Sequence, residues 1–320
     1  MYRCILALLA AVCPAFAEQV LYACASSTKE YVVGAKLPLS GLFRRSGSGE
    51  WKHAGFNHPW VLGIAALDPR TLLIAAGNGL IRATDEGAKW TIVTGSDVTE
   101  LRDVTVSNGV IYFAHSAGIR ASSDRGETWR ELSGGLRRPY TESIRAVNGK
   151  LVAGGESGVF QSGDSGKTWQ LSGAAGFQIM RIAASPHDRC VLIASTQGGG
   201  LFQSNDCGKT FEAMGRIGFG HNTYDVDFDP GTRGQVAAAI WGVGIAVSTD
   251  NGKSWSVRNA GLPGSEVSTV VFDPHKPGRL FTAVRQQGVF VSENAGLNWT
   301  KDGLGDTHVN ILRFVEEGAK

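Results

Sequence analysis

Ser122-Ser-Asp-Arg-Gly-Glu-Thr-Trp129 is the stretch that decides the fold, because copies of it recur along the chain. The shared pattern is Ser-x-Asp-x-Gly-x-Thr/Ser-aromatic. Four copies are close to this pattern, two are looser, and one is decayed and lacks the acidic residue. The aromatic residues that close the copies are Trp51, Trp90, Trp129, Trp169, Phe211, Trp255 and Trp299. The chain is therefore built from seven units.

The closing aromatics follow one another at intervals of 39 to 44 residues. A period near forty with several short strands per unit is typical of a β-propeller and not of a helical solenoid. Each unit has three apolar strand segments before the motif, and the closing aromatic begins a fourth. We therefore predict an all-β, seven-bladed β-propeller of four-stranded antiparallel blades. An additional strand at residues 308–315 is expected to complete the blade that the N-terminal segment begins, so that the ring has no free edge.

The motif itself has a structural explanation. Its aspartate can accept backbone N–H groups of the turn, its glycine tolerates positive φ, and its aromatic side chain buries a large apolar face. The motif lacks the further carboxylates at fixed offsets that a calcium loop needs. We predict that the Asp or Asn side chain at this position stabilises the hairpin between the third and fourth strands of the blade by hydrogen bonds. We expect it to have no catalytic or metal-binding role. The residues at this position are Asp85, Asp124, Asp164, Asp206, Asp250 and Asn294.

These copies resemble the Asp-box (bacterial neuraminidase) repeat of sialidases, xyloglucanases, sortilin-type receptors and photosystem II assembly factors. The resemblance covers almost the whole chain after the first residues and implies the propeller fold. Hydrolases and pure binding proteins share the repeat, so the resemblance leaves function open. A single short propeller is most similar to the photosystem II assembly factor group. The Arg-Ile-Pro motif of sialidases does not occur, and xyloglucanases usually join two propellers.

The N-terminal residues predict export. Arg3, the apolar run of residues 5–12 and Ala15-x-Ala17 match a secretory signal peptide at residues 1–17. The propeller is then a single domain at residues 18–320, in the periplasm or outside the cell. The chain carries 31 Lys and Arg against 29 Asp and Glu. This near-neutral charge gives no basis for binding nucleic acid, and any membrane association would be peripheral.

Three cysteines follow the predicted leader. Cys190 and Cys207 flank a strand-turn-strand segment, and an antiparallel hairpin centred there would place them almost opposite each other. We predict a disulfide between them, the alternative being two buried thiols. Cys24 remains, either as a free thiol or as a lipid attachment site, although Tyr22 and Leu21 fit a lipidation signal poorly.

The loops that join one blade to the next carry more aromatic and charged residues than the motif side does. Arginines bind carboxylates in bidentate fashion, and Trp and Tyr are frequent interface anchors. The candidate binding residues are Trp60, Arg102, Arg137, Arg138, Tyr140, Arg181, Tyr224, Trp241 and Arg285. In the alternative interpretation, these arginines simply pair with Glu100, Glu142, Asp225 and Glu266 on a solvated rim.

We expect a non-catalytic, monomeric scaffold that binds another protein and needs no cofactor or metal ion. The alternative is a glycoside hydrolase or a glycan-binding propeller that uses the same face. Tyr140 with Glu142 is the one local grouping similar to the tyrosine–glutamate pair of sialidases. The seven histidines are scattered without metal-ligand spacing.

Overall fold

The computed structural model describes residues 18–27, 40–47, 49–84, 87–136 and 138–317. The predicted signal peptide at 1–17, the repeat residue Asp85 and the candidate binding residue Arg137 lie outside these ranges. The described residues contain no helix that could cross a membrane.

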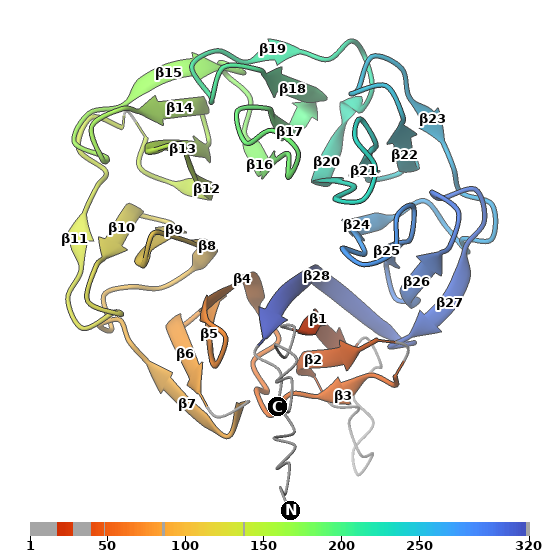
Figure 1. The fold of residues 1–320 in the computed structure, drawn as a ribbon, viewed down its shortest axis with the longest axis horizontal. Coiled ribbons are helices and arrows are strands. Elements are labelled where there is room, and N and C mark those ends of the chain that lie inside the picture. Colours follow the sequence, from red (N-terminus) through yellow and green to blue (C-terminus); the bar gives the residue numbers. More distant parts are fainter. Residues whose placement is uncertain (1–17, 28–39, 48, 85–86, 137, 318–320) are drawn as a thin grey trace, which may run out of the picture.

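The described strands group into seven sets of four, which fits the predicted seven blades and confirms the all-β propeller fold. Figure 1 shows these sets arranged as a ring around a central axis. We number the blades along the chain and give the strands of each from this axis outward.

The first three blades contain the following strands. Blade 1 consists of β28 (Thr307–Glu317), β1 (Glu18–Ser27), β2 (Gly41–Ser46) and β3 (Lys52–His53). Blade 2 consists of β4 (Val61–Asp68), β5 (Thr71–Ala76), β6 (Gly79–Thr84) and β7 (Lys89–Ile92). Blade 3 consists of β8 (Leu101–Ser107), β9 (Val110–His115), β10 (Gly118–Ser122) and β11 (Arg130–Glu131).

The other four blades follow the same order. Blade 4 consists of β12 (Thr141–Val147), β13 (Lys150–Gly155), β14 (Gly158–Ser162) and β15 (Gln170–Gly173). Blade 5 consists of β16 (Ile179–Ala184), β17 (Leu192–Gly199), β18 (Leu201–Ser204) and β19 (Glu212–Ala213). Blade 6 consists of β20 (Phe219–Phe228), β21 (Val236–Ile240), β22 (Gly244–Ser248) and β23 (Ser256–Val257). Blade 7 consists of β24 (Val267–Phe272), β25 (Leu280–Val284), β26 (Gly288–Ser292) and β27 (Thr300–Gly303).

The apolar core lies between the blades. Among the described residues, buried side chains form seven clusters, and each cluster draws on two adjacent blades. In one of them, Leu73 of β5 packs with Val104 of β8 and Phe113 of β9. A blade therefore buries both of its faces only when it has a neighbour on each side, and the ring is the arrangement that gives every blade two neighbours.

The Asp-box turn is held by a compact set of hydrogen bonds. In blade 3, the Ser122 hydroxyl donates to Asp124 Oδ1 at 2.7 Å and accepts from Gly126 N at 2.8 Å. Asp124 also accepts from the backbone N–H of Thr128 at 2.9 Å and from its hydroxyl at 2.5 Å. Arg125 has a φ of 63° and Gly126 a φ of 93°, so the turn places two successive residues, not only the glycine, in the left-handed region. The same contacts surround Asp164, Asp206 and Asp250. Asn294 keeps the bonds made by Oδ1.

Three closing tryptophans, Trp129, Trp169 and Trp299, are hydrogen-bonded to the blade before their own. Trp129 Nε1 donates to the carbonyl of Val93, which follows β7, at 2.8 Å. Trp169 Nε1 donates in the same way to Leu132, which follows β11, at 2.7 Å. The large apolar ring is thus buried against the preceding blade while its one polar atom is satisfied there.

The ring closes through blade 1, where the two ends of the chain meet. β28 pairs antiparallel with β1 along its whole length, from Glu317 opposite Glu18 to Thr307 opposite Ser27. This is the closure that the sequence predicted for the C-terminal strand. Cys24 lies in the middle of β1 as a buried free thiol, and burial raises its pKa to about 12, so it is inert. Cys190 and Cys207 are joined by a disulfide between the β16–β17 loop and the Asp-box turn of blade 5.

Removal of residues 306–320 should abolish cooperative unfolding, because β1 then loses its partner and the ring gains two free edges. A milder variant, Leu312→Ala, empties a fully buried position of β28 and should lower the free energy of unfolding by about 2–5 kcal/mol. Both effects can be measured by thermal and urea unfolding. A truncated protein that melts as the intact one does would contradict the closed ring.

Stability should fall in acid because of the Asp-box turns. Hydrogen bonds, chiefly from the hydroxyls of Thr128, Thr168 and Ser254, lower the pKa of Asp124, Asp164 and Asp250, to about 2 for Asp250. A carboxylate whose pKa is lower in the folded state stabilises the fold above the unfolded value and loses that contribution as pH falls through the folded value. The melting temperature should therefore drop between about pH 4 and pH 2. In Asp250→Asn the drop should be smaller, and an unchanged profile in that variant would count against this origin.

Candidate functional site

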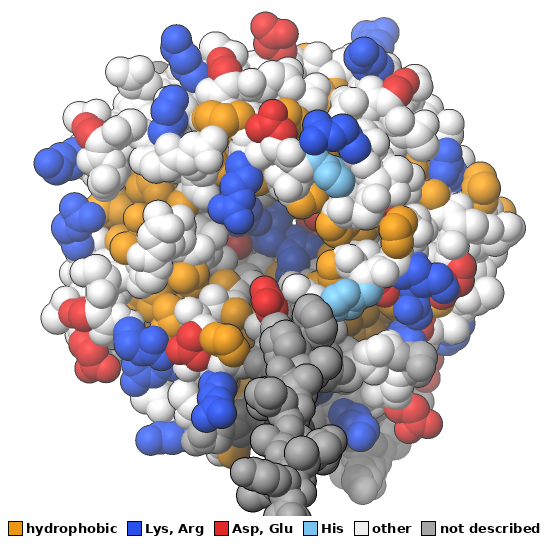
Figure 2. All heavy atoms as spheres, viewed as in Figure 1, with side chains coloured by type: hydrophobic (Ala, Val, Ile, Leu, Met, Phe, Trp, Pro, Cys, Tyr) orange, Lys and Arg blue, Asp and Glu red, His pale blue; other side chains and the backbone are white. Residues whose placement is uncertain are grey.

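The central channel opens into a cavity of about 300 Å³, lined by residues of all seven innermost strands. In a four-stranded antiparallel blade, the Asp-box turn and the connection to the next blade lie on opposite faces of the disk. The lining residues lie near the beginnings of the innermost strands, so the cavity opens on the face of the blade connections. Figure 2 shows a hollow at the centre of the ring with basic side chains inside it.

A β-bulge in every innermost strand builds the mouth of this cavity. Near the start of each strand the pairing with the second strand skips one residue, and this residue lines the cavity. A bulge locally twists the strand and redirects a side chain. The seven bulged positions, which we call the bulge ring, are Leu62, Arg102, Glu142, Met180, Tyr224, Ser268 and Asn310.

Two buried aspartates directly after bulged positions connect neighbouring blades. Asp225 of β20 accepts bonds from Thr269 Oγ1 at 2.6 Å and Val270 N at 3.2 Å in blade 7. Both of its oxygens also accept from Arg313 of β28, each at 2.9 Å. Asp103 of β8 is held in the same way by Ser143, Ile144 N and Arg145 of blade 4. Each of these two aspartates therefore joins its own blade to the next one at the channel wall.

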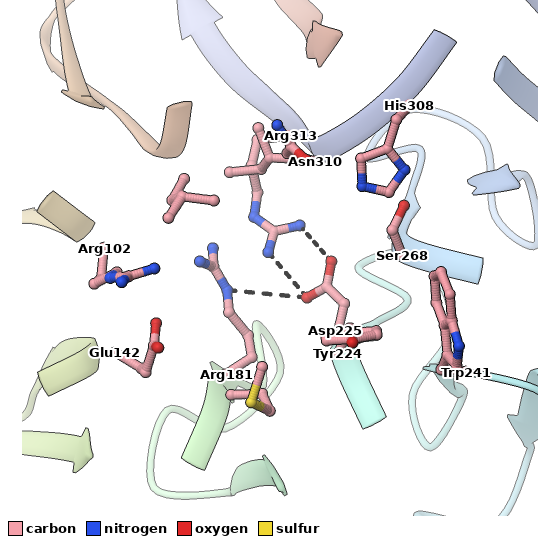
Figure 3. Close-up of a pocket in the computed structure, with 13 residues that line it drawn as sticks. Arg102, Glu142, Arg181, Tyr224, Asp225, Trp241, Ser268, His308, Asn310 and Arg313 are labelled. Carbon is pink, nitrogen blue, oxygen red and sulfur yellow. Dashed lines mark hydrogen bonds and ion pairs between the residues drawn. The ribbon is translucent and has the colours of Figure 1, made fainter. Parts of the chain in front are cut away.

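Arg181 of β16 lies between the two aspartates. Its guanidinium is 3.4 Å from Asp103 Oδ1 and 3.9 Å from Asp225 Oδ1. Figure 3 shows Arg181 and Arg313 both directed at Asp225. Burial, followed by the charge of Arg313, lowers the pKa of Arg181 to about 9, so it stays protonated at neutral pH. Burial alone would raise the pKa of Asp225, but the charges of Arg313 and Arg181 hold it below its ordinary value.

Two carboxyl groups at the channel are shifted toward their neutral form. Burial raises the pKa of Glu142, whose Oε1 accepts from the Tyr140 hydroxyl at 2.8 Å. Burial likewise raises the pKa of Asp227, to about 7. Among the cavity-lining residues the acidic ones are Glu142 and Asp225, against Arg102, Arg181 and Arg313. The cavity lining therefore has one more basic than acidic side chain, and Asp103 beside it also pairs with Arg181.

Arg102 has a donor at the cavity that no described residue accepts from. Its guanidinium is 3.7 Å from Glu100 and lies over the Tyr140 ring at 5.2 Å from the centroid. Within the described part of the chain, its buried Nε has no hydrogen-bond partner. A half-buried guanidinium with a free donor is suited to an anionic ligand group.

The other side of the cavity is aromatic. Tyr224 and Trp241 meet edge to face with ring centroids 5.5 Å apart, and the Arg285 guanidinium lies 5.8 Å from the Trp241 centroid. His308 lines the same side, and burial lowers its pKa, so it is neutral at pH 7. The cavity therefore combines a basic side with a flat apolar side.

The candidate residues chosen from the sequence divide into three groups. Arg102, Arg181, Tyr224 and Trp241 meet in the cavity, and Tyr140 and Arg285 touch it through Glu142 and Trp241. Arg138 lies apart from the lining and pairs with Glu156 at 3.6 Å, while Trp60 is 52% exposed in the loop before β4. The alternative salt bridges also form, because Arg102 approaches Glu100 and Arg285 approaches Glu266.

Sequence reasoning missed Arg313, Asp103 and the polar residues of β28 at the cavity. The sequence signal that could have identified them is a charged residue inside an otherwise apolar strand segment, as in Ile311-Leu-Arg-Phe-Val315. Such a charge is rarely buried without a partner. The described residues hold no group of three His, Cys, Asp or Glu side chains arranged to bind a metal ion.

The fold is that of a β-propeller with Asp-box turns. The family model described as "BNR/Asp-box repeat" matches residues 246–257, the turn of blade 6, and the similar solved structures are propellers. No curated protein is significantly similar to this chain in sequence.

Two solved structures illustrate how broad this class is. YCF48 bound to D1 peptide is 17% identical with a TM-score of 0.59, and the match covers 75% of this chain and 81% of that one. The GH74 xyloglucanase from Xanthomonas campestris is 14% identical with a TM-score of 0.64, and the match covers 95% of this chain. The chain spans only 55% of the xyloglucanase's length. Identities this low show a shared fold and no more.

Replacing Asp225 should destabilise the ring at the channel. Asp225→Asn leaves Arg313 buried without its counter-charge and leaves Arg181 with Asp103 alone, and loss of one partner of a buried pair costs about 3–5 kcal/mol. Urea unfolding measures this change. Asp97→Asn removes an exposed carboxylate that pairs with Arg120 and serves as the control, with little expected change. Equal stability of the two variants would contradict the bridging role of Asp225.

Proposed function

We propose that this protein is an exported, non-catalytic, monomeric propeller that binds an acidic segment of another protein at the mouth of its channel. The observation that carries the proposal is Arg102 in the cavity lining, whose Nε has no hydrogen-bond partner among the described residues, in a lining of three arginines and two acidic side chains. Bidentate pairing with a carboxylate is the favoured interaction of such a group. The aromatic side formed by Tyr224 and Trp241 supplies the anchor residues typical of protein interfaces.

Two further observations support this proposal. YCF48, which has the same fold, is known in a structure "bound to D1 peptide", so an Asp-box propeller can hold a peptide. Export is supported by the leader-like residues 1–17 and by the Cys190–Cys207 disulfide, because disulfides persist in oxidising compartments. A role similar to that of the photosystem II assembly factors is one form that the scaffold function could take.

The second candidate is a glycan-binding or glycan-cleaving propeller. It is favoured by the aromatic wall, by the hydrogen-bonded Tyr140–Glu142 pair and by the likeness to a xyloglucanase. Glycoside hydrolysis usually requires two carboxyl groups free to act on one bond. Glu142 with its raised pKa suits a proton donor, but Asp225 is committed to Arg313, Thr269 and Val270. This cavity therefore supports binding better than hydrolysis.

The proposal predicts that Arg102 controls binding of acidic peptides. The probe is a mixed library of 15-residue peptides with a fixed central Asp, compared with the same library carrying Asn. The Asp peptides should bind more tightly, and Arg102→Gln should weaken their binding at least about tenfold, since a charge-assisted bond contributes about 1.5–3 kcal/mol. Fluorescence anisotropy of the bound pool measures both effects.

The matched control is Arg130→Gln, which removes an exposed arginine from the outer strand of the same blade. Equal binding of the Asp and Asn libraries, or no binding of either, would sink the protein-binding proposal. Binding of the protein to a polysaccharide on a glycan array would in that case favour the glycan-binding propeller.

A further inference from the structure

Arg102 and Glu142 occupy neighbouring positions of the bulge ring, in blades 3 and 4, and both line the cavity. Figure 3 shows them on the same side of the cavity. Tyr140 contacts both side chains, because its ring centroid lies 5.2 Å from the Arg102 guanidinium and its hydroxyl donates to Glu142 Oε1 at 2.8 Å. A ligand group held by Arg102 is therefore placed beside the Glu142 carboxyl group.

The two oxygens of the Glu142 carboxyl group differ in their contacts. Oε1 accepts from the Tyr140 hydroxyl and, at 3.4 Å, from the side-chain amide of Gln178. Oε2 accepts a hydrogen bond from no residue in the described part of the chain. Since Glu142 lines the cavity and Oε1 is already engaged, Oε2 is the oxygen that remains for a ligand.

The guanidinium of Arg102 is open in the same way. Its nearest carboxylate contact is with Glu100, at 3.7 Å, which is beyond hydrogen-bond distance. The other two arginines of the lining differ from it, because Arg181 and Arg313 pair with buried aspartates. The corner of the cavity formed by Arg102 and Glu142 thus offers donors on one side chain and a single unused oxygen on the other.

Several further charges act on Glu142. The charged and titratable groups of the surrounding elements are Glu100, Arg102 and Asp103 of blade 3 and the segment before it, Tyr140 before β12, Arg181 of blade 5, Asp225 of blade 6, and His308 and Arg313 of blade 1. Burial raises the pKa of Glu142, and the charge of Arg102 opposes this effect more than any other charge does. The protonation of Glu142 therefore depends on what else Arg102 binds.

A carboxylate bound at Arg102 favours the protonated form of Glu142. Two ionised carboxylates that share one guanidinium in a half-buried site repel each other, so one of them takes up a proton. Protonation turns Glu142 Oε2 into a donor, and the bound carboxylate can then accept from Oε2 and from Arg102 together. The proton comes from the solvent, and no covalent bond forms or breaks.

We propose that Glu142 determines whether the cavity selects a carboxylate or a carboxamide, because it shares one proton with a bound carboxylate. An Asp side chain binds with uptake of this proton. An Asn side chain needs none, since its amide donates to ionised Glu142 and its carbonyl oxygen accepts from Arg102. The preference for Asp is therefore strongest in mild acid and declines as pH rises. This inference rests on the proposed function and adds how the bound residue is chosen.

The probe is the tightest-binding 15-residue peptide from a central-Asp pool that has no Asp, Glu, His or Cys at other positions and has both ends blocked. Its twin carries Asn in place of the central Asp. The Asp side chain, with an ordinary pKa of about 3.9, stays ionised from pH 5 to pH 8.5, so any change across this range belongs to the protein.

The affinity for the Asp peptide should fall as pH rises. A group whose pKa is raised in the complex strengthens binding below its value in the free protein, and this contribution is lost as pH rises through its value in the complex. Between pH 5 and pH 8.5 the Asp peptide should therefore lose at least about tenfold in affinity, while the Asn peptide changes less than about twofold. Fluorescence anisotropy measures both.

Titration calorimetry gives a second measure on the unaltered protein. Heats of binding in buffers of different ionisation enthalpy yield the number of protons taken up. Near neutral pH the Asp peptide should take up about half to one proton, and the Asn peptide none. Burial raises the pKa of Asp227 to about 7, in the same range, but Asp227 lies outside the lining and should affect both peptides alike.

Glu142→Gln imitates the protonated glutamate. It keeps the oxygen to which Tyr140 and Gln178 donate and places an N–H donor at the position of Oε2. The affinity of this variant for the Asp peptide should vary less than about twofold across the pH range, because no group then takes up the proton.

Two control variants should retain the pH dependence of the Asp peptide. His308→Asn removes the other titratable side chain of the lining, whose pKa is lowered by burial and which would also gain charge in acid. Glu156→Gln removes an exposed glutamate of the same blade, which pairs with Arg138 at 3.6 Å. Circular dichroism melting verifies that all variants are folded between pH 5 and pH 8.5.

The outcomes separate the inference from the proposed function. If the Asp and Asn peptides show the same pH dependence, or if the Asp peptide takes up no proton, the inference fails and the proposed function stands. The same holds if the tenfold change persists in Glu142→Gln or is lost in His308→Asn instead. If no central-Asp peptide binds at any pH, both fail.

Discussion

The pairing of β28 with β1 is the interaction on which the whole molecule depends. The seven apolar clusters lie between blades, so each blade is stable only while both neighbours are present. The ring is made from a linear chain, and one junction must therefore join its two ends. Ten residues of β1 opposite β28 supply that junction with backbone hydrogen bonds, and Leu312 and Val309 supply it with apolar burial. Loss of this pair would expose blade faces on both sides of the break.

Hydrogen bonds join neighbouring blades in two separate places, at the rim of the disk and at the channel. At the rim, closing tryptophans such as Trp129 and Trp169 reach back to carbonyls of the preceding blade. At the channel, Asp103 and Asp225 reach forward to the next innermost strand. The apolar clusters fill the space between these two places. The rim contacts repeat with the motif, whereas the channel contacts differ from blade to blade, and this difference gives the mouth its uneven charge.

The sequence predicted the blades far better than the mouth, for a physical reason. Seven copies of a turn motif with a fixed period determine which strands share a blade, and closure by the last strand follows from the need to remove edges. The bulges leave no comparable mark, because a shift of one residue in register exchanges the two faces of a strand without changing its composition. Arg102 and Asp103 are adjacent, and a regular strand would have sent them in opposite directions. The bulge instead places Arg102 at the mouth and lets Asp103 bind the next blade. The arginines of the loops that join the blades nevertheless indicated the face of the disk on which the cavity opens.

The bulge ring lies beside the residues that hold neighbouring blades together and lines the cavity. Its seven residues take no part in the paired register of their strands, and the residues after them carry the contacts between blades. Exchange of Met180 or Leu62 for a different side chain would therefore alter the chemistry of the mouth while the core stayed as it is. During divergence, such a frame can acquire a new partner through seven substitutions at fixed places, with no insertion and no rebuilding of a loop. Propellers of this design can thus become dissimilar in what they recognise long before they become dissimilar in shape.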